Sequence, residues 1–441
     1  MGKYFRTDGV RGEANTVLGP RLVMEIGAAY AAVLEEEGKA RPRIVVGRDS
    51  RWSGDMLEAA FTAGACARGA DVLRAGLLPT PGVAYLARTL ENVSGGVVIS
   101  ASHNPIGDNG LKLFSSKGFK VPDEIEDRVE ACLESGAAWN NVPTGTGVGR
   151  VYDVADAESR FVDFLCAQAE TLKGLRVVLD CAHGAAARVG PTVLRRLGAE
   201  VFVLHDEPDG ARINVRCGST DLSELQARVK DTGAHLGLAF DGDADRCLAV
   251  DEQGDKVDGD QMLLAFARKS PGNQILVSTV MSNLGLEMAL REIGVEMRRA
   301  AVGDRYVLEE MLRCGSVLGG EQSGHVIFLD VSTTGDGVLT AVRLADTVRA
   351  AGQPLSALTR MPQVPQLLVN VTTPHKDRLD QDSEIAAAIA EIENRLRGRG
   401  RLLVRPSGTE PMVRVMAEGP DEAELHQVVG ALVRLIEKNL S

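Results

Sequence analysis

Short apolar strands alternate with helical stretches along most of this 441-residue chain. The runs rich in β-branched residues, which we expect to form strands, span 42–50, 175–184, 199–205, 235–243 and 273–279. Between them lie segments whose apolar residues recur at helical spacing, such as 190–198 and 283–294. A strand, a covering helix and a further strand together form the repeating unit of a helix-covered sheet. The alternation therefore predicts an α/β fold.

Three segments break the alternation and divide the chain. The first, 136–150, is rich in Gly and Thr, the second, 251–261, is polar, and the third, 360–366, contains two prolines. We predict four domains, which span 1–150, 151–252, 253–362 and 363–441.

The last of these domains is small and is built differently from the others. Alternating strands on either side of the PSGTEP turn precede a closing helix. That helix should bury five apolar residues at helical spacing, which are Leu425, Val428, Val429, Leu432 and Ile436.

Net charge and the absence of targeting signals in the sequence limit which kinds of partner and compartment we expect. The net charge of −12 argues against a general nucleic-acid or anionic-membrane surface, although local arginines can still bind a small anion. The first residues lack the apolar core of a signal peptide, and no apolar run approaches the length of a membrane span. The seven cysteines are scattered and contain no CxxC pair. We expect a cytoplasmic protein with free thiols.

The first candidate site follows the buried run Val97–Ile99, where Ser100-Ala101-Ser102-His103-Asn104-Pro105 ends the strand. A serine at the carboxyl end of such a strand stands where α/β proteins place ligands. A polar turn with a helix cap is the alternative. Taken alone, His103 could equally be a structural histidine and Lys112 a surface lysine, rather than catalytic residues. No G-x-S-x-G motif supports an ordinary hydrolase triad.

The second candidate site is the loop Asp241-Gly242-Asp243-Ala244-Asp245-Arg246. Three carboxylates at alternate positions repel one another unless a cation lies between them. Oxygen ligands without a nearby histidine favour a hard ion, above all Mg²⁺. An EF-hand is excluded because Arg246 occupies the position that needs glycine, and because the flanking segments are expected to be strands. A solvated acidic turn is the other alternative.

Two further polar loops suit sugar hydroxyls and phosphate. Glycines surround Glu321, Gln322 and Ser323 in one loop, which offers several hydrogen-bond donors and acceptors. The other combines two arginines with hydroxyls and a glycine backbone, a set that suits a dianion. Its candidate ligands are Arg405, Ser407, Gly408, Thr409 and Arg414. Plain solvent loops are the alternative for both.

Together the four loops require a phosphorylated, hydroxyl-rich molecule, a divalent cation and a serine nucleophile. Because they belong to four different predicted domains, a shared cleft at the domain junction is the simplest arrangement. In this interpretation the strand at 97–99 ends in order to present Ser102 to a phosphoryl group.

The motifs SASHNP, DGDADR, GEQSGH and RPSGTEP, in this order, resemble those of the α-D-phosphohexomutase superfamily, and the likeness runs from residues 5–12 to the C-terminus. The resemblance implies three related α/β domains and a smaller C-terminal α+β domain around a central cleft. DNGLK, INVRCGSTD and VGDRYV are similar to the branch that interconverts glucosamine 6-phosphate and glucosamine 1-phosphate. Such an activity would supply UDP-N-acetylglucosamine for cell-wall synthesis.

The resemblance also implies roles for individual residues. Ser102 would be a phosphoserine that exchanges its phosphoryl group through a glucosamine 1,6-bisphosphate intermediate. Mg²⁺ would be held by the Ser102 phosphate together with Asp241, Asp243 and Asp245. The other catalytic residues would be Arg11, His103 and Lys112. Substrate would be bound by Arg246, Glu321, Ser323, Arg405, Ser407, Gly408, Thr409 and Arg414.

Three alternatives to this activity remain at the level of sequence. The first is a phosphomannomutase or phosphoglucomutase of the same fold. The second is a sugar-phosphate phosphatase, which an enclosed cleft disfavours because it excludes water. A non-catalytic sugar-phosphate sensor, the third, would be expected to lose the serine or an aspartate, and all are present. We expect no nucleic-acid or membrane partner and either a monomer or a homodimer.

Overall fold

The computed structural model describes residues 2–5, 8–38, 40–269, 272, 274–407 and 411–441. The chain forms two compact units, which are described separately below. The first comprises 1–279 and 298–360, and the second 280–297 and 361–441. No helix within the described ranges is long and apolar enough to cross a membrane.

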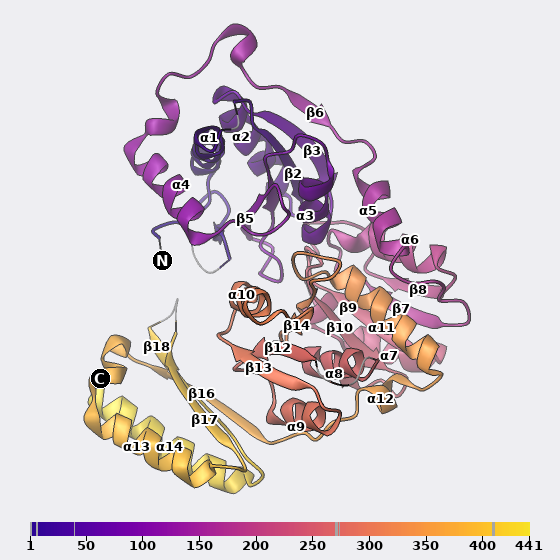
Figure 1. The fold of residues 1–441 in the computed structure, drawn as a ribbon, viewed down its shortest axis with the longest axis vertical. Coiled ribbons are helices and arrows are strands. Elements are labelled where there is room, and N and C mark those ends of the chain that lie inside the picture. Colours follow the sequence, from indigo (N-terminus) through magenta and orange to yellow (C-terminus); the bar gives the residue numbers. More distant parts are fainter. Residues whose placement is uncertain (1, 6–7, 39, 270–271, 273, 408–410) are drawn as a thin grey trace. The chain divides into compact units, whose positions relative to one another are not determined.

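The first sheet of the larger unit has the order β1-β5-β4-β2-β3-β6 (Figure 1). Its strands are β1 (Val10–Glu13), β2 (Arg43–Arg48), β3 (Asp71–Leu77), β4 (Gly95–Ile99), β5 (Asp108–Ser115) and β6 (Val151–Asp153). β2 pairs in parallel with β3 and β4, whereas β5 runs antiparallel to both β4 and β1. The predicted strand at 42–50 is thus confirmed, and the carboxyl ends of β2 and β4 lie side by side.

Helices cover this sheet, and two of them approach each other unusually closely. The elements are α1 (Pro20–Glu36), α2 (Ser53–Ala67), α3 (Thr80–Thr89), α4 (Asp123–Ser135) and the 3₁₀ turns η1 (Ala137–Trp139) and η2 (Gly145–Gly147). A Cβ on Gly27 of α1 would lie 2.3 Å from the carbonyl oxygen of Phe61, and one on Gly64 of α2 only 1.9 Å from that of Met24. Glycine at both positions therefore permits the α1–α2 contact.

The second sheet has the order β11-β10-β9-β7-β8. Its strands are β7 (Arg176–Asp180), β8 (Glu200–Leu204), β9 (Leu236–Phe240), β10 (Cys247–Asp251) and β11 (Lys256–Val257). They are accompanied by α5 (Ala157–Cys166), α6 (Ala186–Arg196), η3 (Gly218–Thr220) and α7 (Ser223–Thr232). β7, β8 and β9 are parallel, so the residues that follow Asp180, Leu204 and Phe240 share one edge of the sheet. The predicted strands at 175–184, 199–205 and 235–243 and the helix at 190–198 are confirmed.

The third sheet has the order β13-β12-β14-β15. Its strands are β12 (Ile275–Thr279), β13 (Glu296–Ala300), β14 (Leu318–Gly320) and β15 (Val326–Phe328), and the division between the two units runs through β13. The helices are α8 (Gly259–Lys269), α10 (Asp304–Cys314), α11 (Gly337–Ala351) and α12 (Leu355–Leu358). The strand predicted at 273–279 is confirmed as β12.

The smaller unit contains an antiparallel sheet with the order β16-β18-β17. Its elements are β16 (Gln366–Thr372), β17 (Arg401–Pro406), β18 (Met412–Glu418), α9 (Leu284–Glu292), α13 (Ser383–Leu396), α14 (Glu422–Asn439) and η4 (Lys376–Gln381). Figure 1 shows α13 and α14 lying along one face of this sheet. The five residues predicted to line the closing helix are all buried, and α9 confirms the helix predicted at 283–294.

Candidate active site

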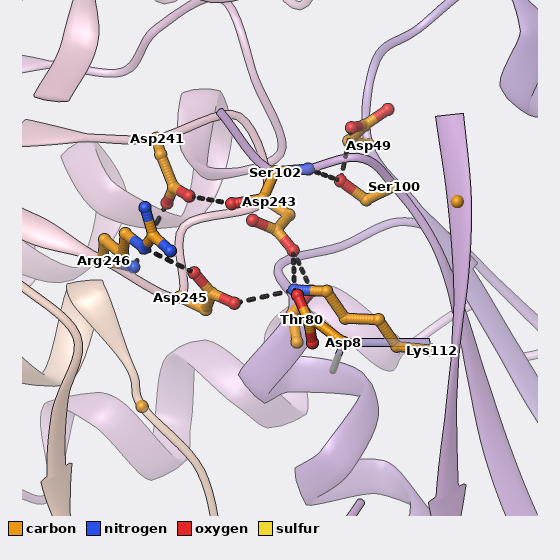
Figure 2. Close-up of polar contacts among 12 residues, drawn as sticks. Asp8, Asp49, Thr80, Ser100, Ser102, Lys112, Asp241, Asp243, Asp245 and Arg246 are labelled. Carbon is orange, nitrogen blue, oxygen red and sulfur yellow. Dashed lines mark hydrogen bonds and ion pairs between the residues drawn. The ribbon is translucent and has the colours of Figure 1, made fainter. Parts of the chain in front are cut away.

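The serine loop follows directly after β4. Ser102 adopts a left-handed backbone conformation with φ of 52°, and its side chain is buried. A non-glycine residue in this region carries backbone strain, which accumulates at functional sites. Its hydroxyl donates a hydrogen bond of 2.5 Å to Oδ2 of Asp241 (Figure 2). The same hydroxyl lies 3.3 Å from Nδ1 of His103. The backbone therefore presents Ser102 to an acidic loop 139 residues further along the chain.

A buried arginine, which the sequence interpretation missed, fixes the shape of this loop. The side chain of Arg51 is fully buried and donates to four carbonyl oxygens. These belong to Ser102 (3.0 Å), Asn104 (2.8 Å), Pro105 (2.5 Å) and Asp108 (2.9 Å). Five guanidinium donors in a rigid fork suit such an array, and each bond is strengthened by the charge.

Asp49 and Ser100 complete the support. Asp49 accepts hydrogen bonds from Nε of Arg51 at 2.9 Å and from the hydroxyl of Ser100 at 2.6 Å. The Ser100 oxygen in turn accepts from the backbone N–H of Ser102 at 2.9 Å. Asp49 and Arg51 follow β2, which neighbours β4 in the sheet. Their position at the end of the strand predicted over 42–50 was the available sequence signal.

The acidic loop connects β9 to β10, so strands flank it as predicted. Asp241, Asp243 and Asp245 are buried, and their ligand atoms all lie within 4.8 Å of one another. Oδ1 of Asp243 and Oδ1 of Asp245 are buried and accept no hydrogen bond from any described residue. Clustered carboxylate oxygens with open lone pairs are the donors that hard divalent cations prefer. These three residues could therefore hold a metal ion.

Lys112, on β5, compensates part of this negative charge. Its ammonium group donates to Oδ2 of Asp243 at 2.9 Å and to Oδ2 of Asp245 at 2.8 Å (Figure 2). Burial and the two neighbouring carboxylates raise the pKa of Asp241 well above its usual value. Burial also disfavours ionised Asp245, but the combined attraction of Lys112, His325 and Arg246 outweighs it and holds the pKa of Asp245 well below normal. The two carboxyls therefore differ in how readily they ionise.

His103 contacts both the Ser102 hydroxyl and the guanidinium of Arg246. Nη1 of Arg246 lies 3.0 Å from Nδ1 of His103, and its backbone N–H donates to Asp241 at 3.1 Å. Partial loss of water around the ring, together with the charges of Arg246 and Arg11, lowers the pKa of His103 to about 4, although part of the residue remains exposed. The imidazole is therefore neutral near pH 7 and can accept a proton.

Arg11 reaches the site from β1. It pairs with Gly110 in the β1–β5 register, which places it beside the strand that carries Lys112. Its guanidinium donates to Asp8, whose carboxylate also lies 3.6 Å from Nζ of Lys112. The structure thus gathers all four predicted catalytic residues around the acidic loop.

A second charged network, also missed, extends from Asp8. Lys120 donates both to Asp8 and, at 2.5 Å, to Asp304. His325 lies between Asp304 and Asp245, with ring nitrogens 3.6 Å and 3.8 Å from their carboxylates. His325 closes the Gly-rich loop recognised in the sequence, but nothing in the sequence linked it to these partners.

That loop, between β14 and β15, holds the predicted sugar ligands. The hydroxyl of Ser323 donates to Oε2 of Glu321 at 3.3 Å, while Oε1 of Glu321 accepts from the backbone N–H of Gly303. The carbonyl oxygen of Gly324 accepts from the N–H of Cys247, the residue that follows the acidic loop. The Gly-rich loop and the acidic loop are therefore joined by a backbone hydrogen bond within the larger unit.

The remaining predicted ligands belong to the smaller unit. Arg405 and Arg414 face each other across the β17–β18 ladder. Burial and the charge of Arg414 lower the pKa of Arg405. Lys376, not foreseen from the sequence, donates to the carbonyl oxygen of Ser407 at 2.6 Å. Like charges at directly opposite positions of two paired strands repel each other. An anion bound between them would reduce this repulsion. Gly408 and Thr409 lie outside the described residues.

Family comparisons agree with this geometry. Models of phosphoglucomutase/phosphomannomutase α/β/α domains I, II and III match residues 2–138, 159–254 and 258–364, and the model of the C-terminal domain matches 368–435. The chain belongs to the phosphoglucomutase/phosphomannomutase family. Three α/β domains and a smaller C-terminal α+β domain, the predicted fold class, are thereby confirmed.

Curated relatives in this family extend over the whole chain. The phosphoglucosamine mutase of Moorella thermoacetica is 53% identical over 445 residues, which cover 99% of both chains. That of Desulforudis audaxviator is 53% identical and covers 99% of this chain and 98% of its own. A solved phosphoglucomutase/phosphomannomutase family protein from Burkholderia thailandensis has a TM-score of 0.84 at 26% identity and covers 98% of this chain and 97% of its own.

Proposed function

We propose that this chain catalyses the phosphoglucosamine mutase reaction, the interconversion of glucosamine 6-phosphate and glucosamine 1-phosphate. The observation that carries the proposal is the buried Ser102 hydroxyl, held 2.5 Å from a cluster of three aspartates. Two full-length relatives at 53% identity, both phosphoglucosamine mutases, support the choice of substrate.

The proposed cycle consists of two phosphoryl transfers. A sugar hydroxyl attacks the phosphorus of phosphorylated Ser102, the bond from phosphorus to Oγ breaks, and the hydroxyl proton moves to a base. The product is glucosamine 1,6-bisphosphate, which turns and returns its other phosphate to Ser102. Neutral His103, 3.3 Å from the Ser102 hydroxyl, is a candidate base, while Arg11, Arg246 and Lys112 place positive charge around the transferred group.

Mg²⁺ is the ion that we propose for the acidic loop. The donor set fits, because the buried cluster offers only oxygen ligands and two of its carboxylate oxygens accept no hydrogen bond from the described residues. Bound there with the Ser102 phosphate, the ion would neutralise charge that develops during transfer. Asp241, Asp243 and Asp245 would supply the carboxylate ligands. The Thr80 hydroxyl donates a hydrogen bond of 2.6 Å to Asp243 and so helps to orient it.

Substrate binding divides between two loops in this proposal. Glu321 and Ser323 would bind the sugar hydroxyls in both orientations. The non-reacting phosphate would be held by Arg405, Ser407, Gly408, Thr409 and Arg414, and Lys376 lies close enough to assist. The four-domain division at 150, 252 and 362, with a monomeric or homodimeric assembly, is part of the same proposal.

Turnover on three sugar phosphates tests the reaction. We expect the purified chain to convert glucosamine 1-phosphate with a kcat/KM well above those for glucose 1-phosphate and mannose 1-phosphate. Higher values for either of the latter would contradict the substrate assignment. Steady release of inorganic phosphate from the substrate would indicate a phosphatase instead.

Metal dependence tests the acidic loop separately. Chelation should abolish activity reversibly, and Mg²⁺ should restore it. Asp243→Asn should weaken Mg²⁺ binding and lower kcat by about a hundredfold or more, because metal neutralisation supplies several kcal/mol. Unchanged activity in excess chelator would remove the metal from the mechanism.

A further inference from the structure

A second cluster of ligating side chains lies at the edge of the second sheet and shares no residue with the proposed reaction. Asp180 ends β7, His205 follows β8, and Cys217 precedes η3. Their ligand atoms lie within 4.8 Å of one another. Asp180 and Cys217 are buried, and the Cys217 thiol forms no disulfide.

The ring of His205 has the orientation typical of a metal-ligating histidine, with one nitrogen toward the cluster and the other toward a carboxylate. Nδ1 of His205 is buried and lies 3.1 Å from Oδ1 of Asp180. The two atoms are not aligned for a hydrogen bond, and Nδ1 forms none with any described residue. Nε2 of the same ring lies 3.3 Å from Oε2 of Glu224 on α7. A ligating histidine characteristically gives its other ring N–H to a carboxylate, which fixes the tautomer and the ring orientation.

The aspartate is held in place in the same manner. Oδ1 of Asp180 accepts from the N–H of Ala182, and Oδ2 accepts from the N–H of Gly218, both at 2.9 Å. Each oxygen retains a further lone pair. Tetrahedral bonds of about 2.0–2.3 Å separate ligand atoms by roughly 3.3–3.8 Å, so small side-chain rotations would close this cluster around an ion.

We propose that Asp180, His205 and Cys217 form a zinc site, with water as the fourth ligand. Sulfur and imidazole donors favour Zn²⁺ over the Mg²⁺ suited to the all-oxygen loop at 241–245. On binding, the Cys217 S–H bond breaks, the thiolate joins the metal and the proton passes to solvent. The site is independent of the reaction proposed above.

Its position gives the ion a structural role. Cys217 lies three residues beyond Asn214, whose side-chain N–H donates to the carbonyl oxygen of Ser102 at 2.8 Å. A metal that ties the 213–220 segment to the ends of β7 and β8 would therefore also hold the segment that contacts the serine loop.

Zinc and cobalt binding to the full chain test the proposal, with excess Mg²⁺ present to occupy the aspartate loop. We expect one Zn²⁺ per chain in competition with a chromogenic chelator, and a thiolate-to-cobalt charge-transfer band when Co²⁺ is added. Cys217→Ser should abolish the band and lower zinc affinity. Cys166→Ser, a half-buried cysteine on α5, is the matched control and should change neither.

Glu224→Gln provides a second measurement should Cys217→Ser fail to fold. Glu224 is largely exposed, so the substitution should leave the fold intact while it weakens zinc binding by about 10- to 100-fold through the loss of its contact with His205. Equal zinc affinity in this variant and the wild type, or no thiolate band in wild type, would overturn the site. The contact between His205 and Asp180 would then be an ordinary ion pair.

Discussion

The serine loop and the β17–β18 hairpin are both proposed to meet phosphate, but they are built in opposite ways. Around Ser102, buried cations are paired with carboxylates: Arg51 with Asp49, and Lys112 with Asp243 and Asp245. On the hairpin, Arg405 and Arg414 occupy directly opposite positions on adjacent strands.

The difference follows from what each region would do. A reacting centre must hold its groups in place before substrate arrives, because orientation lowers the barrier only when it is already set. A region that only holds a phosphate can place two arginines side by side, because both can donate charge-assisted hydrogen bonds to one dianion. Substitutions around Ser102 are therefore expected to lower kcat and the free energy of unfolding. Substitutions on the β17–β18 hairpin are expected to raise KM.

The largest effect should come from Ser102→Ala, which removes the hydroxyl that carries the phosphoryl group. We expect at least a thousandfold loss of kcat, roughly, in a folded protein. Ser100→Ala is the matched control, since Ser100 supports the N–H of Ser102 without facing Asp241, and it should cost far less. The opposite ranking of the two variants would place the nucleophile at Ser100.

Arg51→Met tests whether the serine loop depends on buried charge. The change leaves Asp49 buried without its cation and four carbonyl oxygens without their donor. Breaking a buried pair in this way typically costs about 3–5 kcal/mol of unfolding free energy. Chemical denaturation measures the loss, and Arg21→Met on the surface of α1 should stay within about 0.5 kcal/mol of wild type. Equal stability of both variants would show that Arg51 does not support the loop.

Arg414→Ala should act on binding rather than on folding. Loss of charge-assisted hydrogen bonds worth about 1.5–3 kcal/mol should raise KM by about 10- to 100-fold. A mutase should also release more bisphosphate and depend more on added glucosamine 1,6-bisphosphate. Arg434→Ala, exposed on α14, is the control in the same unit. An unchanged KM and bisphosphate dependence would show that the hairpin is not the phosphate site.

Local pattern was sufficient to predict the loops but not their supports. Ser102 and Asp241 each follow a short apolar strand, so the strand pattern indicated where their side chains would be presented. Glu321 was identified instead from the composition of its Gly-rich loop. Arg51 binds carbonyl groups more than 50 residues away, and Lys120 meets Asp304 across 184 residues. Contacts of this kind depend on which strands become neighbours, and a single sequence carries no direct signal for that.

The smallest effect concerns Asp336, a buried carboxyl that, unlike Asp245, forms no ion pair with a cationic side chain among the described residues. Its Oδ1 caps α11 by accepting from the N–H of Leu339, and its Oδ2 is buried without a hydrogen bond. Burial raises its pKa to about 7, although the backbone N–H of Leu339 opposes the rise. Between about pH 4 and pH 7 folded Asp336 therefore keeps a proton that it has released in the unfolded chain, and its contribution to stability should fall as pH rises through this window.

Asp336→Asn retains a capping oxygen but cannot ionise. Its unfolding free energy relative to wild type should therefore grow by about 1–2 kcal/mol between pH 5 and pH 8, measured by denaturation without divalent metal. Asp421→Asn, at the exposed N-cap of α14, should show no comparable growth. A constant difference for Asp336→Asn across this range would mean that Asp336 ionises as easily in the folded chain as in water. Burial without an ion pair would then not be enough to raise the pKa of a carboxyl in this fold.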